Sequence, residues 1–168
     1  TYLSQSYTIT DKGLRTGVTV TPMQSSSPIN LLTAQLKQDF KLGILNWENV
    51  VTYQHSSKEV VPVPDLDIYT NLYIKFSIAK VLHIDLGADA RYFTSYTAPD
   101  YSPYMGQYVV QGNGDKNVKV GNYPIVNVYA NAFIKHTRFF VMMSHIYAGQ
   151  GDRIYFWTPH YAINGRVF

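Results

Sequence analysis

The chain has 168 residues and a formal net charge of +3, and charged residues make up 15% of it, where a soluble domain usually carries about 25%. Its lysines and arginines are scattered singly, which argues against nucleic-acid binding, and the lack of cysteine excludes disulfides and thiolate metal sites. No window contains roughly 18 consecutive apolar residues, so a transmembrane helix is excluded on length. Fifteen tyrosines indicate strand surfaces, or rings that lie between lipid and water.

Alternation of apolar and polar residues predicts β-strands along most of the chain. The clearest strand lies between Leu32 and Leu42, where Gln38 is the one break in the alternation. No segment shows a comparable helical period. The predicted strands cover residues 3–10, 14–21, 32–42, 45–55, 68–79, 82–92, 125–136 and 139–147, and a partial ninth strand ends the chain.

Short and long connections alternate between these strands. Tight turns are predicted at residues 11–13, Gly43, Lys80 and Thr137. The longer connections cover residues 22–30, 56–66, 97–123 and 148–160. A single-chain outer-membrane barrel has this order, because its periplasmic turns are short and its extracellular loops are long. Soluble sandwiches have Greek-key crossings and no reason to keep it.

Strand length agrees with a membrane barrel. About 11 residues at roughly 3.3 Å each, tilted by about 45°, span the apolar band of about 25 Å of such a barrel. Soluble strands average only about 5 or 6 residues. The fold class predicted is therefore all-β, an antiparallel up-and-down transmembrane β-barrel in which residues 1–168 are part of a single barrel domain.

Alternation alone does not decide which face meets water, because a soluble lipocalin-like barrel would turn its polar face outward. Here the polar face is rich in Asn, Thr and Gln, and Trp47, Tyr53, Tyr92 and Tyr96 lie toward strand ends, where aromatic girdles occur. Both features favour a lipid-facing apolar surface. The residues predicted to face lipid are Leu32, Leu36, Phe40, Leu82, Ile84 and Leu86. The residues predicted to face a lumen are Lys37, Asp39, Lys41, Glu48, Asn71, Lys75, His83, Asp85, Asp89, Arg91, Asn127, Asn131 and Lys135.

The polar residues give no sign of catalysis, of a metal site or of a cofactor site. His83, Asp85 and Asp89 share a strand face, but a polar barrel wall produces the same row without a metal. Residues 112–115 form a turn signal and not a phosphate-binding loop. The predicted wall mixes both signs of charge, which predicts weak ion selectivity at most. Residues 97–123 are expected to form an ordered extracellular loop, with folding into the lumen as the alternative.

A series of short motifs runs along the chain: Tyr53-Gln54-His55-Ser56-Ser57, Val61-Pro62-Val63-Pro64, Asn71-Leu72-Tyr73, Leu86-Gly87-Ala88-Asp89, Arg91-Tyr92-Phe93-Thr94-Ser95-Tyr96, Gly121-Asn122-Tyr123-Pro124, Arg138-Phe139-Phe140-Val141 and Asn164-Gly165-Arg166. In their identity and order these motifs resemble the C-terminal part of the "putative porin" family of Bacteroidota outer membranes. They cover the chain from about Leu31 onward. The resemblance implies an outer-membrane barrel with no catalytic residues to carry over. Family members look longer, so the chain is expected to be a portion of a larger barrel.

The predicted function is a non-enzymatic, porin-like channel for passive diffusion of small hydrophilic solutes across the bacterial outer membrane. Its expected partners are outer-membrane lipids, such solutes and other outer-membrane proteins, and not nucleic acid. One alternative is a non-conducting structural or accessory barrel of a larger outer-membrane assembly. The other is a soluble, lipocalin-like ligand-binding barrel. The sequence assigns no solute.

Overall fold

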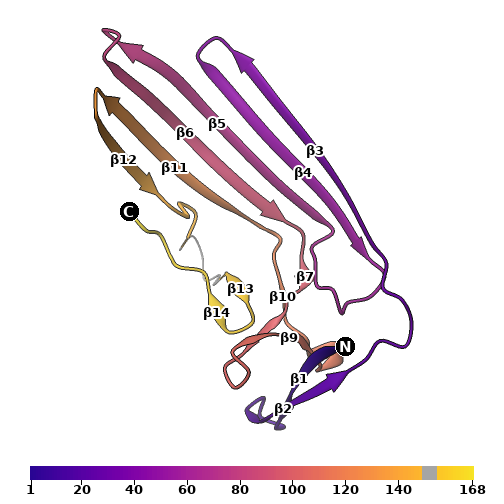
Figure 1. The fold of residues 1–168 in the computed structure, drawn as a ribbon. Helices are drawn as coiled ribbons and strands as arrows, with labels where there is room; N and C mark the ends of the chain where they lie inside the picture. The colour runs from indigo at the N-terminus through magenta and orange to yellow at the C-terminus, as the bar shows by residue number, and fades with distance from the viewer. Residues whose placement is uncertain (149–154) are drawn as a thin grey trace.

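The structure is a computed structural model that describes residues 1–148 and 155–168. Every regular element in these residues is a β-strand except the 3₁₀ turn η1 (Gly114–Lys116). Long strands form one sheet, and short strands gather in a layer at one end of it (Figure 1). The predicted all-β class is confirmed. No helix in the described residues has the length and apolar character needed to cross a membrane.

The main sheet has six strands in the order β12-β11-β6-β5-β4-β3. Neighbouring strands are antiparallel throughout and follow one another along the chain, as in an up-and-down meander. The sheet is open, with β3 and β12 at its edges, and no sheet of the described residues closes into a barrel. The strands are β3 (Leu31–Leu42), β4 (Leu45–Ser56), β5 (Leu66–Ile78), β6 (Leu82–Phe93), β11 (Tyr123–Ile134) and β12 (Thr137–Met143).

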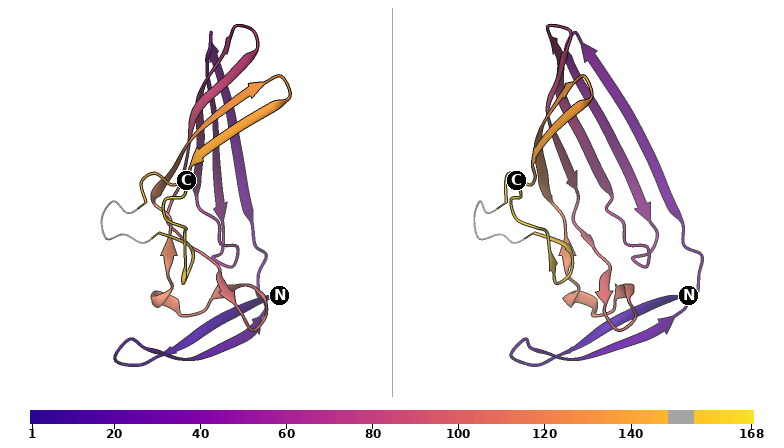
Figure 2. Two further views of the ribbon diagram at one scale, coloured as in Figure 1. Left: turned by 90° about the vertical axis from the view of Figure 1, so that its left-hand side faces the viewer. Right: turned by 60° about the vertical axis from the view of Figure 1, so that its left-hand side comes forward.

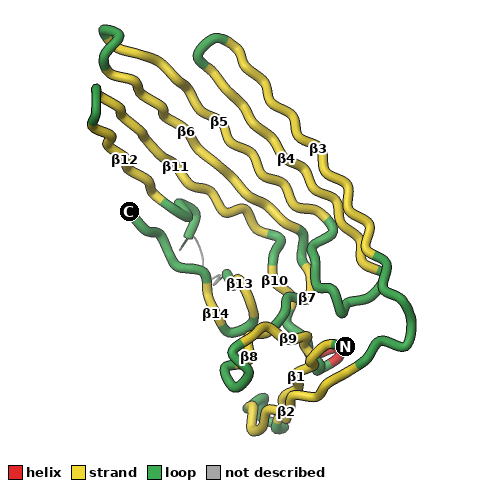
Figure 3. Tube along the Cα trace, in the orientation of Figure 1, coloured by secondary structure: helices red, strands yellow, loops and turns green. Residues whose placement is uncertain are grey.

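Tight turns join these strands at one end of the sheet, and longer connections lie at the other (Figure 3). Gly43 adopts a φ of 60° between β3 and β4, and Ala79 and Lys80 adopt 51° and 56° between β5 and β6. Such left-handed residues match the twist of a two-stranded hairpin. The third turn begins at Lys135, whose φ is 49°. The predicted strand 125–136 therefore ends two residues early, at Ile134. Lys135, which was predicted to face a lumen, lies in the turn and not on a strand.

The first two strands are not part of the meander, contrary to the prediction. They form a hairpin that runs across the end of the main sheet (Figure 2). Ser4 pairs with Val110 and Gln5 with Gln111, in a short parallel contact with β9. The physical reason is that Gln5 and Tyr7, on the same face of β1, bond to the buried carboxylate of Asp100 and hold the strand to the short strands at this end. The elements are β1 (Tyr2–Ile9), β2 (Arg15–Met23), β8 (Asp100–Ser102) and β9 (Gln107–Gln111).

The long connections contain short strands of their own, so the prediction of about nine strands was too low. We define the loop layer as residues 1–23, 94–122 and 155–163. Residues 149–154 of the predicted loop 148–160 lie outside the described residues. The predicted last strand is reduced to an isolated bridge between Ser144 and Val167. The remaining elements are β7 (Tyr96–Thr97), β10 (Lys119–Val120), β13 (Phe156–Thr158) and β14 (Tyr161–Ala162).

The register assigns every strand residue to one of two faces, because residues paired across an antiparallel ladder point to the same side. Leu36 pairs with Val51, and Val51 pairs in turn with Ile68. We call the side of the sheet that carries Leu36, Val51 and Ile68 the apolar face. The opposite side, which carries the paired residues Asp39 and Glu48, is the polar face. Leu36 is 64% exposed, so nothing in the described chain covers the apolar face there.

The buried hydrophobic cluster lies at the end of the polar face where the long connections are. Phe93, Tyr123 and Ile125 are its buried members, and Tyr96, Tyr155 and Ile163 pack against them. Residues of the loop layer therefore fold over the polar side of the sheet. Tyr96 does not belong to an outer aromatic girdle as predicted, because it packs edge-on against Phe93, which points to the polar face.

Gly87 allows a tyrosine to lie flat across the polar face. It pairs with Tyr73 on one side and with Tyr129 on the other. A Cβ atom at this position would lie 2.6 Å from the Tyr129 hydroxyl oxygen and 2.6 Å from the Tyr73 Cβ. The missing side chain lets the Tyr129 hydroxyl cross β6 and donate to Asn71 Oδ1 at 2.9 Å.

Replacing Gly87 by alanine is expected to lower the free energy of unfolding by about 1–3 kcal/mol, because the added methyl group overpacks this row. Thermal unfolding in detergent, followed by circular dichroism, measures the change. Gly165→Ala is the matched control, since no atom lies within 4 Å of the position its Cβ would occupy. Equal stability of the two variants would contradict the close packing at Gly87.

Candidate functional site

The polar face carries all the residues predicted to face a lumen except Lys135. All six residues predicted to face lipid lie on the apolar face. The prediction missed Tyr69, Tyr73 and Tyr129, which also point to the polar face. The alternation that predicts the side of Asn71 and Asn127 also predicts the side of these three tyrosines. The sequence prediction did not use it for them, because a tyrosine ring is compatible with either face.

Carboxylates and amides form one row across the polar face. Asp39, Glu48, Asn71, Asp89 and Asn127 are successive partners on β3, β4, β5, β6 and β11. Asn71 Nδ2 donates to Glu48 Oε2 at 3.4 Å, and Asn127 Nδ2 donates to Asp89 Oδ2 at 2.8 Å.

Basic side chains flank this acidic row on both sides. Lys37 and Lys41 point to the same side as Asp39, two residues before and after it on β3. Arg91 lies two residues beyond Asp89 on β6, and it donates from Nη2 to Asp67 Oδ2 at 2.8 Å. The polar face therefore presents both signs of charge within a short distance along β3 and along β6.

Tyrosines are bonded into the same wall. The Tyr73 hydroxyl donates to Glu48 Oε1 at 2.6 Å. The Lys75 ammonium lies 4.9 Å from the centre of the Tyr73 ring, within the range of a cation–π contact. These contacts hold polar and aromatic side chains against the sheet, so the wall offers hydrogen-bonding groups on an ordered surface.

The polar face is hollowed near the loop layer. A hollow of about 350 Å³ lies over β3, β4, β5 and β6, and one of about 450 Å³ lies over β5, β6 and β11. Tyr69 and Arg91 line both, so they form the ridge between them. Residues 163–165 and Val167 also line the larger hollow.

The apolar face carries aromatic residues near both strand ends. Phe40 and Trp47 contact each other near the tight turns, with ring centres 5.5 Å apart. Tyr53 and Tyr92 lie on the same face near the loop layer. Three of the four aromatic residues expected at girdles therefore share the apolar face, and Tyr96 does not.

Gln38, the one break in the alternation of β3, belongs to a short polar row on the apolar face. It pairs with Asn49, which in turn pairs with Thr70. The Thr70 hydroxyl donates to Asn49 Oδ1 at 2.8 Å and accepts from Trp47 Nε1 at 2.8 Å. The side chains of Trp47, Asn49 and Thr70 thus bond to one another, which lowers the cost of placing their polar groups in an apolar medium.

The chain matches the sequence model of the family described as "Putative porin" over residues 1–168. The chain belongs to this family. The match confirms the resemblance found in the sequence and extends it to residues 1–30, which the landmark motifs did not reach. No curated protein and no solved structure matches the chain.

Membership of this porin family supports a porin-like, non-enzymatic role. Among residues 1–148 and 155–168, no group of three or more His, Cys, Asp and Glu side chains is placed to hold a metal ion. The expectation that the protein uses no metal or cofactor stays a prediction. The family does not assign a solute.

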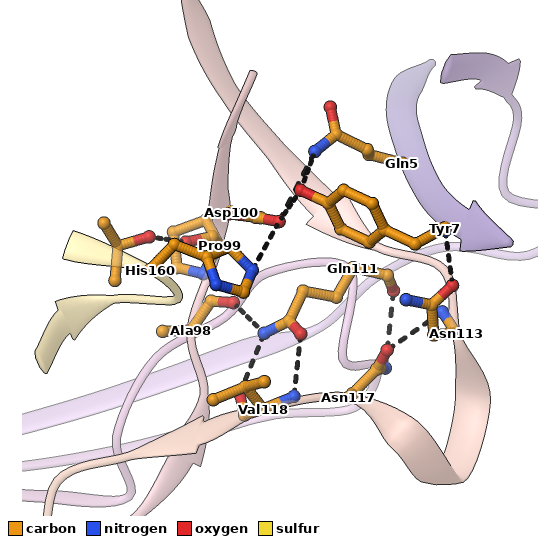
Figure 4. A network of polar contacts seen from close by, with 11 residues as sticks. Gln5, Tyr7, Ala98, Pro99, Asp100, Gln111, Asn113, Asn117, Val118 and His160 are labelled. Carbon is orange, nitrogen blue, oxygen red and sulfur yellow. Dashed lines mark hydrogen bonds and ion pairs between the residues drawn. The ribbon is translucent and has the colours of Figure 1, made fainter. Parts of the chain in front are cut away.

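A buried carboxylate attaches the β1–β2 hairpin to the rest of the loop layer (Figure 4). Asp100 is 1% exposed, and its Oδ2 accepts from the Tyr7 hydroxyl at 2.6 Å and from Gln5 Nε2 at 3.4 Å. His160 Nε2 lies 3.8 Å from the same oxygen. The backbone N–H of Tyr7 also donates to Asn113 Oδ1 at 2.8 Å. These contacts join segments about 100 residues apart in the sequence, and the sequence analysis did not single them out.

Amide side chains fold residues 98–118 into an ordered unit. Gln111 Nε2 donates to the carbonyls of Ala98 and Val118 at 2.7 and 2.8 Å, and the Val118 N–H donates to Gln111 Oε1 at 2.7 Å. The Thr158 hydroxyl donates to the Pro99 carbonyl, which ties β13 to the same unit. The predicted loop 97–123 is therefore held by specific hydrogen bonds.

Tyr96 lies where this unit meets the main sheet. Its burial raises the pKa of the Tyr96 phenol above its usual value of 10.0, while the nearby Arg91 guanidinium acts in the opposite direction. The Tyr96 phenol is therefore neutral at physiological pH.

Asp100→Ala is expected to loosen the β1–β2 hairpin, because it leaves Gln5 and Tyr7 without their carboxylate partner. A lost hydrogen bond to a charged group costs about 1.5–3 kcal/mol, so amide hydrogen exchange in β1 should speed up by about tenfold or more. Mass spectrometry of β1 peptides measures it. Asp115→Ala, at an exposed acid of η1, is the control. Unchanged β1 exchange in Asp100→Ala would show that the hairpin is held by other contacts.

Proposed function

We propose that the main sheet is part of a transmembrane β-barrel of the bacterial outer membrane, and that the protein is a channel for passive diffusion of small hydrophilic solutes. The observation that carries this proposal is the separation of the two faces along six consecutive strands. A barrel with this sheet in its wall would present leucine, isoleucine, phenylalanine and alanine to lipid. It would present the carboxylates, amides, tyrosines and basic residues to the lumen.

Exposure of the apolar face supports lipid as its environment. Leu32 is 62% exposed, Leu36 64% and Phe40 51%. An apolar patch across several strands is unfavourable in water but suits the hydrocarbon of a bilayer. Strands β3, β4 and β6 have 12 residues each, which at about 3.3 Å per residue and a tilt near 45° gives about 28 Å. This length fits the apolar band of an outer-membrane barrel.

The position of the buried cluster argues against a soluble, lipocalin-like barrel. Such a barrel would enclose its apolar face as the core. Here Phe93, Tyr123 and Ile125 are buried on the polar side, under residues of the loop layer. The chain therefore folds toward its polar face, which supports that face as the interior of the barrel.

In the proposed orientation the tight turns lie on the periplasmic side and the loop layer on the outer side. The segments 22–30, 56–66, 97–123 and 148–160 would then be extracellular, as short turns and long loops are arranged in bacterial barrels. Residues 1–168 would belong to one barrel domain, whose partners are outer-membrane lipids and small hydrophilic solutes. Charges of both signs on the wall favour weak ion selectivity.

A second function receives support from the loop layer. Because this layer covers one end of the polar face, a non-conducting barrel that serves as a structural or accessory subunit of a larger outer-membrane assembly is the alternative. Such a barrel would keep the same lipid-facing surface but would pass no solute.

Leu36→Arg is expected to cost about 2–4 kcal/mol, because it places a charge near the middle of the lipid-facing surface. Gln35→Arg is the matched control: it is the adjacent residue, points to the polar face and should change stability by about 0.5 kcal/mol or less. Urea unfolding of the protein in lipid bilayers measures both. Similar costs for the two variants would contradict the assignment of the faces.

A companion variant separates the membrane barrel from a soluble one, in which Leu36→Arg would also be harmful. Lys37→Leu combined with Lys41→Leu should leave folding in bilayers intact, because both side chains would lie in the lumen. On a soluble exterior the same change would create a sticky patch and cause aggregation.

The channel itself is tested by single-channel recording in planar bilayers, with the full-length protein extracted in detergent. We expect stable, ohmic conductance steps with little preference between cations and anions. A folded barrel that gives no steps and co-purifies with partner proteins would overturn the channel in favour of the accessory subunit.

A further inference from the structure

We propose that the larger hollow of the polar face is a binding site for a neutral polyhydroxyl solute, a sugar of one or two rings. This inference rests on the proposed channel, because it takes the polar face as the path of the solute. The site is lined by residues of β5, β6 and β11, by Trp157 of β13 and by residues 163–165 and Val167 of the C-terminal segment. At about 450 Å³ it falls in the usual range of small-molecule sites, roughly 300–1,000 Å³.

An aromatic platform forms one side of the hollow. Trp157 of β13 stacks on Phe93, with ring centres 6.5 Å apart and planes 12° from parallel. Phe93 is 5% exposed whereas Trp157 is 50% exposed, so the indole is supported from below and open to a ligand. The C–H groups of a sugar ring carry partial positive charge and pack well on the negative face of such a ring. Tyr69 adds a second aromatic side chain to the lining.

The polar groups of the hollow both donate and accept hydrogen bonds. Asp89 supplies carboxylate oxygens, and Asn164 and Arg91 supply N–H groups. Hydroxyl groups, which also donate and accept, match this mixture. An anionic solute is disfavoured because the Arg91 charge is balanced by Asp67 at 2.8 Å, while Asp89 adds negative charge.

His145 provides an independent sign of a ligand. It lines the hollow, is 4% exposed, and its Nε2 has no hydrogen-bond partner in the described part of the chain. Its Nδ1 lies 3.1 Å from the Asn164 carbonyl oxygen, so in the neutral ring the proton is on Nδ1 and Nε2 offers a lone pair. A buried acceptor without a donor is costly, and a hydroxyl group of a bound solute would supply that donor.

The backbone holds His145 in an unusual conformation at this position. Its φ is 53°, in the left-handed region that residues with a Cβ rarely adopt, and its N–H donates to Asn127 Oδ1 at 2.9 Å. Asn127 Nδ2 in turn donates to Asp89 Oδ2 at 2.8 Å. One asparagine therefore positions both the histidine and the carboxylate, as strained residues at binding sites are often positioned.

Maltose is the test ligand, and it is added to the full-length protein extracted in detergent. The protein carries Trp47→Phe, so that Trp157 is the one tryptophan left in residues 1–168 and its fluorescence reports binding. We expect a saturable change in its fluorescence. Asp89→Asn should weaken the affinity for maltose by at least about tenfold, because hydrogen bonds to a charged group are lost. Asp39→Asn, in the same row but three strands away on β3, should change the affinity less than about twofold. The absence of saturation, or equal effects of the two variants, would overturn the site.

His145→Phe serves where Asp89→Asn fails to fold, since it removes the unpaired acceptor and keeps an aromatic ring. It too should weaken maltose binding by about tenfold. Gluconate tests the charge class, because it carries hydroxyl groups and a carboxylate. Gluconate binding as tight as that of maltose would overturn the preference for neutral solutes.

Single-channel recording separates this proposal from the channel on which it rests. We expect maltose to interrupt the conductance steps of the wild-type protein and to interrupt those of Asp89→Asn far less. Conductance steps that maltose does not affect would overturn the sugar site and leave the channel standing. Maltose binding by a protein that gives no steps would overturn the channel and leave a sugar-binding barrel.

Discussion

The antiparallel hydrogen-bond ladder from β3 to β12 is the constraint on which the rest of the structure depends. Side chains alternate with a period of two, so a slip of one residue between any two strands would move an entire apolar row to the polar side. Twelve-residue pairings such as β3 with β4 and β6 with β11 define the register over their full length. In a bilayer, these ladders also satisfy backbone groups that no water can reach. The apolar face and the polar face are thus two consequences of one register.

The few departures from alternation are compensated locally. Gln38 places an amide on the apolar face, but its neighbours Asn49 and Thr70 continue a polar row in which the side chains bond to one another and to Trp47. On the opposite face, Gly87 removes a side chain so that the Tyr129 hydroxyl can reach Asn71 across β6. In both cases polar side chains of different strands bond to each other, Asn49 with Thr70 and Asn71 with Tyr129.

The loop layer is organised by different forces from the sheet. Its strands are short and its centre is polar, with Asp100 buried beside Gln5 and Tyr7 and with Gln111 bonded to two backbone carbonyls. Tyr101 packs against Tyr108 and Tyr161 within the layer, and other residues of the layer pack against the sheet at Phe93 and Tyr123. The layer therefore covers the polar face where the hollows and the buried His145 lie. In a channel, this end of the wall would be the part that a solute meets first, and its contacts would set which solutes enter.

The sequence by itself determined the six long strands, the tight turns at Gly43 and Lys80 and the side to which most strand residues point, because these features depend on a period of two within each strand and on local turn chemistry. The third turn lies at residues 135–136 and not at Thr137 as predicted. It did not determine the placement of β1, since the partner of Tyr7 lies 106 residues away at Asn113 and the pairing depends on side-chain contacts that no local pattern records. Lys135 was misplaced because a strand end is set by where the ladder stops and not by the alternation, which continues into the turn. The acidic row and the hollow beside His145 were decided by the tertiary structure alone, because both require the register between strands that are distant in the sequence.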